Sequence, residues 1–291
     1  MRPRERAGSP LMGFVLPPRG VVLGVASLVL KEGATIDGAL SVVRAAVDAG
    51  VVAIDTARAY ATVDDDAAGE RIAQAARAQS PGIPIITKAG HFRVARAAWD
   101  VDGSPERVRA DALRSREVLG APPSLLLLHR ADRVDDIDAS VRELAALRDE
   151  GVVEAIGLSN ASVELLDRAR AITEIDAVEN RFGFGVDPAT EYRYCVEAGI
   201  PLLAYAPFGG PKAEPLATRV PRVAASAMAH GISVHRAALA AMLDAMPGAW
   251  PVIGSTRVES VLDSIAASAH AVDDDLRRAF AEDLRSRGVG L

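Results

Sequence analysis

Short apolar runs alternate along most of this chain with longer segments in which apolar residues have helical spacing. Eight of these runs are candidate strands, at residues 21–24, 52–55, 85–88, 125–129, 155–159, 177–180, 202–205 and 251–253. The segments between them are long enough for crossover helices, which join parallel strands. The pattern predicts an α/β chain that folds as a closed (β/α)8 TIM barrel rather than an open sheet.

The segments between the strands carry the start and stop signals of helices. Thr35 precedes a helical segment that closes on Gly50, and Ser104 with Pro105 opens the segment that follows the third candidate strand. Hydroxyl residues before a helix and glycine after it are common helix caps. Residues 273–288 have amphipathic spacing, so we expect additional C-terminal helices to pack against the barrel.

The domain organisation follows from the length and from the amino-terminal residues. With 291 residues, 49% of them hydrophobic, the chain fits one barrel, and we expect a single domain over residues 1–291. Residues 1–20 should form a tail and a segment at the bottom of the barrel. Pro17, Pro18 and Arg19 interrupt the apolar residues in this region, so it predicts neither an export signal nor a membrane span.

Charge and cysteine content narrow the classes of partner. The net charge is -6 and the calculated pI is near 5.5, whereas nucleic-acid binding needs a basic face. Cys195 is the only cysteine, so no disulfide within the chain is possible, and we expect a cytoplasmic location. A small molecule is the expected partner, with no membrane and no metal; the sequence does not indicate an oligomeric state.

Polar residues stand where the apolar runs stop. Asp55, Lys88 and His129 end the second, third and fourth candidate strands, and Tyr60 follows Asp55 by five residues. The carboxyl ends of parallel strands meet at one mouth of a barrel, so these side chains should form one cluster. A lysine ammonium beside a tyrosine favours the tyrosinate, and a carboxylate keeps the lysine charged. The chemistry indicated is proton delivery to a carbonyl oxygen.

The segments that carry these residues resemble motifs of the aldo-keto reductase family. They are AIDTARAY, ITKAG, LLLLHRAD, GVVEAIGLSN, GIPLLAYAPFGG and PVIGSTRVESVLDS, in the family's order from Val21 to about Ser268. The resemblance implies that Tyr60 is the general acid, that Lys88 and Asp55 adjust its acidity, and that His129 orients the substrate carbonyl.

The same resemblance implies a nicotinamide cofactor bound without a Rossmann fold, and the chain has no strand–GxGxxG–helix unit. Ser159, Asn160 and Glu179 would contact the carboxamide, and Tyr205 would stack on the nicotinamide. The adenosine phosphate would lie at the loop of Gly254, Ser255, Thr256 and Arg257. A helix start beside an arginine suits a 2′-phosphate, so NADP(H) is favoured over NAD(H).

The chain departs from the family pattern at several positions. Glu179 stands where the family usually has glutamine, and a carboxylate beside a nicotinamide favours its oxidised, positively charged form. Asp263 and Ser264 replace the Glu-Asn pair near the adenine, so adenine contacts should be weaker or rearranged.

The loop after Lys88 and a group of phenylalanines supply candidate substrate residues. They are His91, Arg93, Trp99 and Phe182, with Phe184 and Phe208 as further parts of an apolar wall. Arginines favour a phosphate, carboxylate or polyhydroxylated partner, so a sugar-like or small polar carbonyl compound is the first expectation. The alternative is that Trp99 covers a hydrophobic gap and the arginines are solvated.

These observations predict an NADP(H)-dependent oxidoreductase that reduces an aldehyde or ketone, or oxidises the corresponding alcohol, with Tyr60 as general acid and base. Two alternatives remain open. One is a redox-neutral epimerase or lyase that holds its cofactor tightly, and the other is a non-catalytic cofactor-sensing partner protein.

Overall fold

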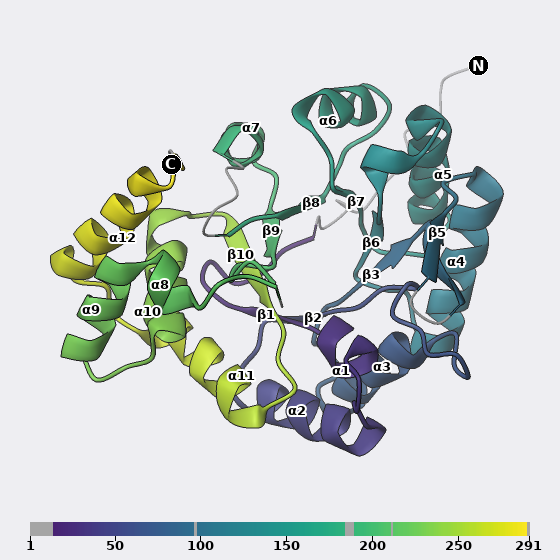
Figure 1. The fold of residues 1–291 in the computed structure, drawn as a ribbon. Helices are drawn as coiled ribbons and strands as arrows, with labels where there is room; N and C mark the ends of the chain where they lie inside the picture. Colours follow the sequence, from purple (N-terminus) through teal and green to yellow (C-terminus); the bar gives the residue numbers. More distant parts are fainter. Residues whose placement is uncertain (1–13, 96–97, 184–188, 211, 290–291) are drawn as a thin grey trace.

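Eight parallel strands close into a barrel in the computed structural model, which describes residues 14–95, 98–183, 189–210 and 212–289 (Figure 1). Around the barrel each strand pairs with the next in the order β1-β10-β9-β8-β7-β6-β3-β2. The strands are β1 Val22–Gly24, β2 Ala53–Asp55, β3 Ile85–Ala89, β6 Leu125–Leu128, β7 Ile156–Ser159, β8 Ala177–Arg181, β9 Leu202–Tyr205 and β10 Ala249–Ile253. The predicted (β/α)8 fold is confirmed, and each strand boundary lies within two residues of its prediction.

Helices surround the barrel, and the colours of Figure 1 run around the ring because most strands are followed by their own helix. They are α1 Ala26–Leu30, α2 Ile36–Asp48, α3 Ala68–Gln79, α4 Pro105–Leu119, α5 Ile137–Asp149, α6 Val163–Arg170, α7 Ala189–Ala198, α8 Leu216–Arg219, α9 Pro221–Ala229, α10 Val234–Ala245, α11 Val258–Ile265 and α12 Asp274–Ser286. Thr35 and Ser104 cap α2 and α4 through their side-chain oxygens, as predicted. None of the helices in the described residues is long and apolar enough to span a membrane.

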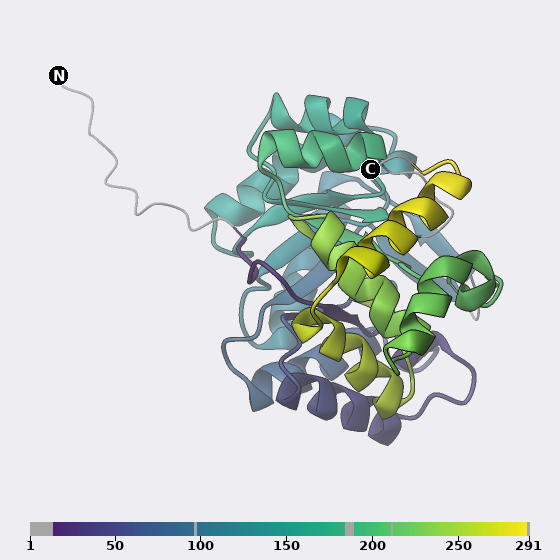
Figure 2. The ribbon, with the colours of Figure 1, turned by 90° about the vertical axis from the view of Figure 1, so that its left-hand side faces the viewer.

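The additional C-terminal helix α12 packs against α9 and α10 on one side of the barrel (Figure 2). Its amino terminus is capped by the Asp273 side chain, which accepts a hydrogen bond from the Leu276 amide at 2.8 Å. Asp283 is fully buried and accepts hydrogen bonds from the first turn of α9, where backbone N–H groups lack helical partners. This cap fixes α9 and α12 to each other.

The interior of the barrel is filled by every second residue of its strands, because side chains alternate between the two faces of a strand. Side chains on the other face of the strands pack under the helices in a separate cluster. Phe14 and Leu16 close the bottom of the inner cluster, and Trp250 donates a hydrogen bond to the Pro17 carbonyl oxygen at 2.8 Å. Residues 1–13 of the predicted tail lie outside the described residues. The inner cluster comprises Phe14, Leu16, Val22, Ala53, Ile86, Leu125, Leu127, Ala155, Ala177, Leu203, Trp250 and Val252.

A two-stranded antiparallel hairpin follows β3, where we predicted a long loop. Its strands are β4 His91–Ala95 and β5 Ala98–Val101. The prediction was wrong because these strands lie outside the barrel and are half exposed, so they contain no continuous apolar run.

Candidate functional site

The alternation that fills the barrel also decides which polar side chains face its axis at the mouth, meaning the carboxyl ends of the strands. Five polar residues at the mouth each lie two residues beyond an inward-facing core residue. They are Asp55, Lys88, His129, Glu179 and Tyr205, and the core residues are at positions 53, 86, 127, 177 and 203 respectively. Two residues along a strand return to the same face. The apolar filling of the barrel therefore continues upward as a layer of ionisable groups.

Three of these groups form an ion triad of Lys88, Asp55 and Glu179. The Lys88 ammonium donates a hydrogen bond to Asp55 Oδ1 and another, 3.1 Å long, to the Thr56 carbonyl oxygen. Lys88 Nζ also lies 3.2 Å from Glu179 Oε2. That approach is not aligned as a hydrogen bond, so Glu179 Oε2 has no hydrogen-bond donor among the described residues. All three side chains are buried, and they come from β3, β2 and β8.

Burial and mutual charge shift the pKa values of the triad. Burial raises the pKa of Glu179 to about 8, with a further increase from the neighbouring Asp55 charge, while Lys88 acts in the opposite direction. Burial also raises the pKa of Asp55, again against the attraction of Lys88. For Lys88, burial favours the neutral amine, but the two carboxylates outweigh it and raise the pKa. Lys88 is therefore charged at pH 7, and Glu179 holds a proton there.

Tyr60 and two histidines lie above the triad. Lys88 Nζ is 5.6 Å from the centre of the Tyr60 ring, and the His129 ring packs edge-on against Tyr60 with centroids 6.0 Å apart. His91, from the hairpin, packs edge-on against His129 at 4.7 Å. Burial raises the pKa of Tyr60, only partly offset by Lys88, and burial lowers the pKa of both histidines. A protonated phenol and neutral imidazoles thus face the mouth at neutral pH, an arrangement able to donate hydrogen bonds and a proton to a bound oxygen atom.

Asn160 joins the triad side of the mouth to Tyr205. Its Nδ2 donates to the His129 carbonyl oxygen at 2.9 Å, and its Oδ1 accepts a 2.7 Å hydrogen bond from the Tyr205 hydroxyl. The backbone of Asn160 is left-handed, with φ of 58°, a conformation that asparagine tolerates better than most residues. Ser159 lies beside it and accepts a hydrogen bond from Asn160 Nδ2 at 3.2 Å.

These groups line a pocket of about 570 Å³, which we call the mouth pocket. Of the predicted residues it includes Asp55, Tyr60, His91, His129, Ser159, Asn160, Glu179, Tyr205 and Gly254. Lys88 contributes its charge from beneath, because its side chain is fully buried.

The prediction missed other lining residues, among them Ser27, Arg130 and Arg181. Ser27 Oγ is buried with no hydrogen-bond partner among the described residues, so a bound molecule could supply one. The available signal was its position just after the first strand, comparable to that of the residues we did select.

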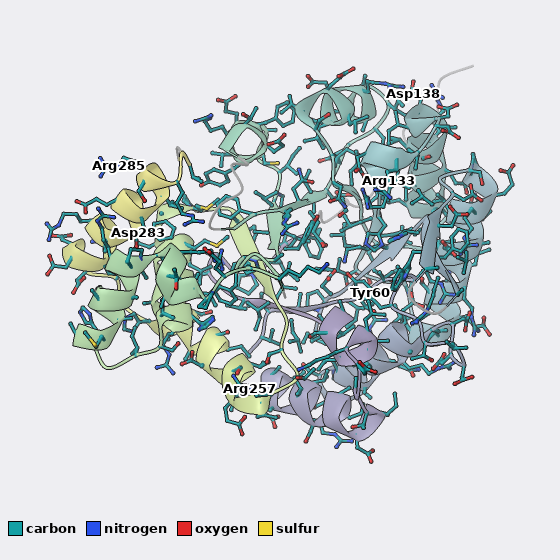
Figure 3. All side chains as sticks on the ribbon, viewed as in Figure 1. Tyr60, Arg133, Asp138, Arg257, Asp283 and Arg285 are labelled. Atoms are coloured by element: carbon teal, nitrogen blue, oxygen red, sulfur yellow. The ribbon has the colours of Figure 1, made fainter. Side chains whose placement is uncertain are left out.

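A second pocket of about 630 Å³ adjoins the mouth pocket and shares Ile253 and Gly254 with it. Ser255 and Arg257, which the sequence analysis assigned to a phosphate site, line it at the amino end of α11. Thr256 points elsewhere and accepts a hydrogen bond from Lys31 at 3.1 Å. Figure 3 labels Tyr60 and Arg257 at separate positions around the barrel, one in each pocket.

Asp263, at the predicted adenine position, is held by neighbouring side chains. It forms a 2.8 Å ion pair with Arg236 and accepts a hydrogen bond from Ser233. Both Asp263 and Ser264 line the adjoining pocket. A ligand there would meet a carboxylate that is already neutralised.

Only one of the four predicted substrate residues lines the mouth pocket, namely His91. Arg93 donates hydrogen bonds to the carbonyl oxygens of Ala61 and Ala95, and the Trp99 indole donates to the Ala59 carbonyl oxygen at 2.9 Å. Phe182 is only 3% exposed and packs in the outer core cluster. Phe184 lies outside the described residues, and Phe208 lines the adjoining pocket instead.

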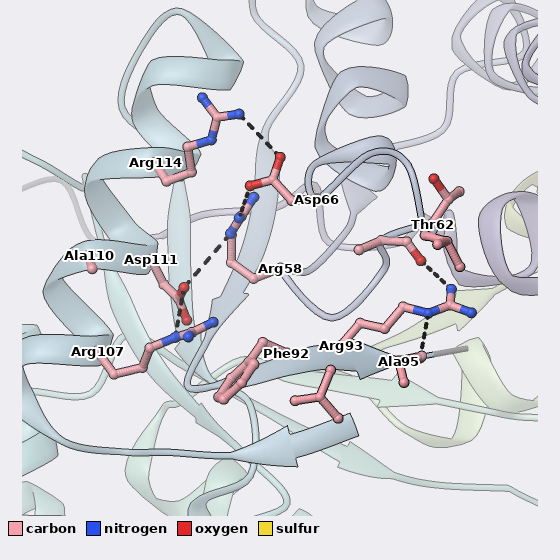
Figure 4. Close-up of a pocket in the computed structure, with 13 residues that line it drawn as sticks. Arg58, Thr62, Asp66, Phe92, Arg93, Ala95, Arg107, Ala110, Asp111 and Arg114 are labelled. Atoms are coloured by element: carbon pink, nitrogen blue, oxygen red, sulfur yellow. Dashed lines mark hydrogen bonds and ion pairs between the residues drawn. The ribbon is translucent and has the colours of Figure 1, made fainter. Parts of the chain in front are cut away.

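A third hollow, of about 510 Å³, lies between the hairpin and α4 (Figure 4). Its arginines are already engaged. Arg58 pairs with Asp66 at 2.9 Å and with the buried Glu70 at 2.7 Å, while Arg107 pairs with Asp111 at 3.1 Å. This ionic cluster packs behind the barrel wall and was not predicted from the sequence.

The fold and the mouth together define a class of protein, a parallel barrel enzyme with an acid–base cluster at the carboxyl ends of its strands. The chain belongs to the aldo/keto reductase family, whose model matches residues 21–282, and it is accordingly an oxidoreductase. It is 29% identical over 272 residues to a probable aldo-keto reductase of Glycine max, covering 83% of this chain and 78% of that protein. An uncharacterized oxidoreductase of Schizosaccharomyces pombe is 25% identical over 238 residues, covering 80% of this chain and 74% of that protein.

Solved structures of similar fold include a glycerol dehydrogenase from Gluconobacter oxydans. That structure has a TM-score of 0.78 and 21% identity, covering 97% of this chain and 98% of the other. A Bombyx mori aldo-keto reductase in complex with NADP has a TM-score of 0.74 and 20% identity, covering 94% of this chain and 93% of the other. At these identities the likeness concerns the fold.

Proposed function

We propose that this protein is an NADP(H)-dependent oxidoreductase that reduces an aldehyde or ketone, or oxidises the corresponding alcohol, with Tyr60 exchanging the proton. The observation that carries the proposal is the convergence of Tyr60, His129 and the ion triad on one pocket. Membership of an oxidoreductase family favours net redox chemistry over the redox-neutral alternative.

The residues of the two pockets fit a nicotinamide cofactor. Glu179 Oε2 and Ser27 Oγ lack hydrogen-bond partners among the described residues, and both belong to residues that line the mouth pocket. Arg257 is exposed at the amino end of α11 and lines the adjoining pocket, where backbone N–H groups and a guanidinium favour a phosphate. We therefore favour NADP(H) over NAD(H), with Ser159, Asn160, Glu179 and Tyr205 around the nicotinamide and Gly254, Ser255 and Arg257 at the phosphate. When bound, the cofactor supplies the hydride.

Four residues at the mouth have roles in proton transfer. Tyr60, whose raised pKa keeps it protonated, donates its proton to the carbonyl oxygen as negative charge develops there. The neutral His129 donates a hydrogen bond to the same oxygen and so orients the carbonyl. Lys88 lies below the Tyr60 ring and stabilises the resulting phenolate, while Asp55 holds the ammonium in place. In the reverse direction the phenolate accepts the proton of an alcohol.

The substrate class follows from the polar lining of the mouth. His91, Arg130 and Arg181 surround the opening, and these polar side chains suit hydroxyl groups better than a long apolar chain. We propose a sugar-like or small polar carbonyl compound. The test measures NADPH loss by absorbance with a panel of aldehydes, ketones and sugars, and NADPH formation with the matching alcohols. Absence of turnover across both panels, with either cofactor, would contradict the proposal.

A further inference from the structure

Two carboxyl groups, Asp55 and Glu179, lie beside a single cation, Lys88, at the base of the mouth pocket. Lys88 is the lysine of the triad, and its ammonium is hydrogen-bonded to Asp55 and to the Thr56 carbonyl oxygen. Glu179 reaches the same ammonium through Oε2 at 3.2 Å without a hydrogen bond. If both carboxyl groups are ionised, the triad carries one negative charge in excess, and Glu179 is the carboxylate that Lys88 neutralises least.

Other groups that face Glu179 do not cancel this charge. Tyr60 and Tyr205 are neutral phenols at pH 7, since burial raises the pKa of both. At the rim, Arg130 is bound to Asp132 by hydrogen bonds of 2.8 and 2.7 Å. Arg181 donates to the Gly209 carbonyl oxygen at 2.8 Å and keeps its charge, but it is exposed and solvent screens it. His91 and His129, on the hairpin and after β6, are held neutral by burial.

Glu179 forms part of the wall of the mouth pocket, although its side chain is only 3% exposed. It lines the pocket together with Tyr205 and Asn160, and its Oε2 is buried against Lys88. Under the proposed function the occupant is the nicotinamide ring, which is positively charged when oxidised and neutral when reduced. A buried carboxylate attracts the first form and gains nothing electrostatic from the second.

We propose that Glu179 selects the oxidised cofactor: its carboxylate pairs with the pyridinium ring of NADP⁺, so the site binds NADP⁺ in preference to NADPH. This inference rests on the proposed function, because it takes a nicotinamide ring as the occupant. A glutamine of the same shape would contact either form without this preference.

This selection predicts that NADP⁺ and NADPH release different numbers of protons when they bind. Glu179 holds a proton in the free protein at pH 7, because burial and Asp55 raise its pKa to about 8. Binding of the cationic ring ionises the carboxyl group, and the proton that leaves Glu179 goes to solvent. NADPH carries no ring charge, so its binding leaves that proton in place. The 2′-phosphate is common to both forms and cancels in their difference.

Isothermal titration calorimetry of the full chain tests the inference without any turnover. NADP⁺ and NADPH are titrated at pH 7 in two buffers of different ionisation enthalpy, which gives the protons released and both dissociation constants. We expect NADP⁺ to release roughly half to one proton more than NADPH. Above pH 9 this difference should vanish, while the preference for NADP⁺ persists.

Glu179→Gln and Glu154→Gln provide the comparison. Glu154 is an exposed glutamate that precedes β7 at the other end of the barrel, so Glu154→Gln makes the same side-chain replacement away from the pocket. In Glu179→Gln the extra proton release should disappear, and the ratio of the NADPH and NADP⁺ dissociation constants should shift about tenfold towards NADPH. Glu154→Gln should match the wild type.

Three outcomes would overturn the inference. Equal proton release by NADP⁺ and NADPH in the wild type, with both binding, refutes selection by Glu179 and leaves the proposed function intact. An unchanged ratio of dissociation constants in a folded Glu179→Gln protein does the same. If neither NADP⁺ nor NADPH binds, the proposed NADP(H) dependence is refuted, and this inference is refuted with it.

Discussion

The Tyr205 hydroxyl donates a 2.7 Å hydrogen bond to Asn160 Oδ1. This bond fixes the orientation of the Tyr205 side chain relative to the loop after β7. Tyr205 ends β9 and Asn160 follows β7, with β8 and its Glu179 between them. Asn160 also donates to the His129 carbonyl oxygen at 2.9 Å. Its amide therefore connects the carboxyl ends of β6, β7 and β9, and its backbone there is left-handed.

Replacing Asn160 with alanine should destabilise the protein by about 2–4 kcal/mol, because three side-chain hydrogen bonds are lost and alanine is strained at positive φ. Urea unfolding measures this change. Asn160→Gly loses the same hydrogen bonds, but glycine adopts a positive φ without strain. It should therefore destabilise the protein by about 1 kcal/mol less than Asn160→Ala. Equal costs would mean that the backbone conformation contributes nothing.

Substituting Tyr60 with phenylalanine should lower turnover at least about a hundredfold, because the variant keeps the ring but has no proton to transfer. NADPH binding, followed by fluorescence titration, should stay within about threefold of wild type. Tyr194→Phe serves as the control, since that hydroxyl binds Asp167 on the surface of the helical layer. Full activity in Tyr60→Phe would exclude Tyr60 as the proton donor.

Removal of the Lys88 charge should be costly even without substrate. Lys88→Met leaves Asp55 and Glu179 buried together without a cation, a situation that typically costs about 3–5 kcal/mol. Thermal and urea unfolding should both detect it. Lys212→Met changes an exposed lysine and should be neutral within about 0.5 kcal/mol. A Lys88→Met protein as stable as that control would show that the triad contributes no net stability.

The raised pKa of Glu179 predicts a pH dependence of stability. Its pKa rises from an ordinary 4.5 to about 8 on folding, so the folded state binds the extra proton between these values. This contribution is complete below pH 4.5 and is lost as the pH rises through 8, by up to about 1.4 kcal/mol per pH unit. Asp55 acts in the same direction, whereas neutral His129 lowers stability as the pH falls below 6.5.

The difference in unfolding free energy between wild type and Glu179→Gln isolates that contribution. It should fall between pH 6 and pH 8 and then level off. A constant difference over this range would indicate that Glu179 is ionised throughout.

Arg257→Ala tests the preference for a 2′-phosphate. The guanidinium is exposed in the adjoining pocket, so its removal should weaken NADPH binding about tenfold and leave NADH within about twofold. Arg116→Ala on α4 is an exposed control with the same loss of charge. Equal weakening of NADPH and NADH would place the arginine at the shared diphosphate instead.

The strands were predictable because both faces of a parallel strand in a barrel are buried, which produces continuous apolar runs such as Leu125–Leu128. The pair of Lys88 and Asp55 was predictable from the strand ends. Glu179 also ends a predicted strand, but its motif suggested a contact with the cofactor carboxamide, and its pairing with Lys88 was not predicted. Its position two residues beyond the inward Ala177 was the unused signal.

Other features depended on contacts that sequence spacing does not reveal. Arg58 meets Glu70 only because a loop and α3 pack together behind β3. The hairpin was not predicted because its strands are half exposed. Its Arg93 and Trp99 were compatible both with contacts to a substrate and with structural roles. In the structure both hold backbone carbonyl groups instead.

Those two carbonyl groups belong to Ala61 and Ala59, the neighbours of Tyr60 on either side. The hairpin that brings His91 to the pocket therefore also holds the loop that carries Tyr60 in place. Exchange of this segment to alter which compounds enter would shift the phenol as well. Laboratory evolution of new substrate ranges should thus proceed fastest when Arg93 and Trp99 are left untouched and only the remaining hairpin positions vary.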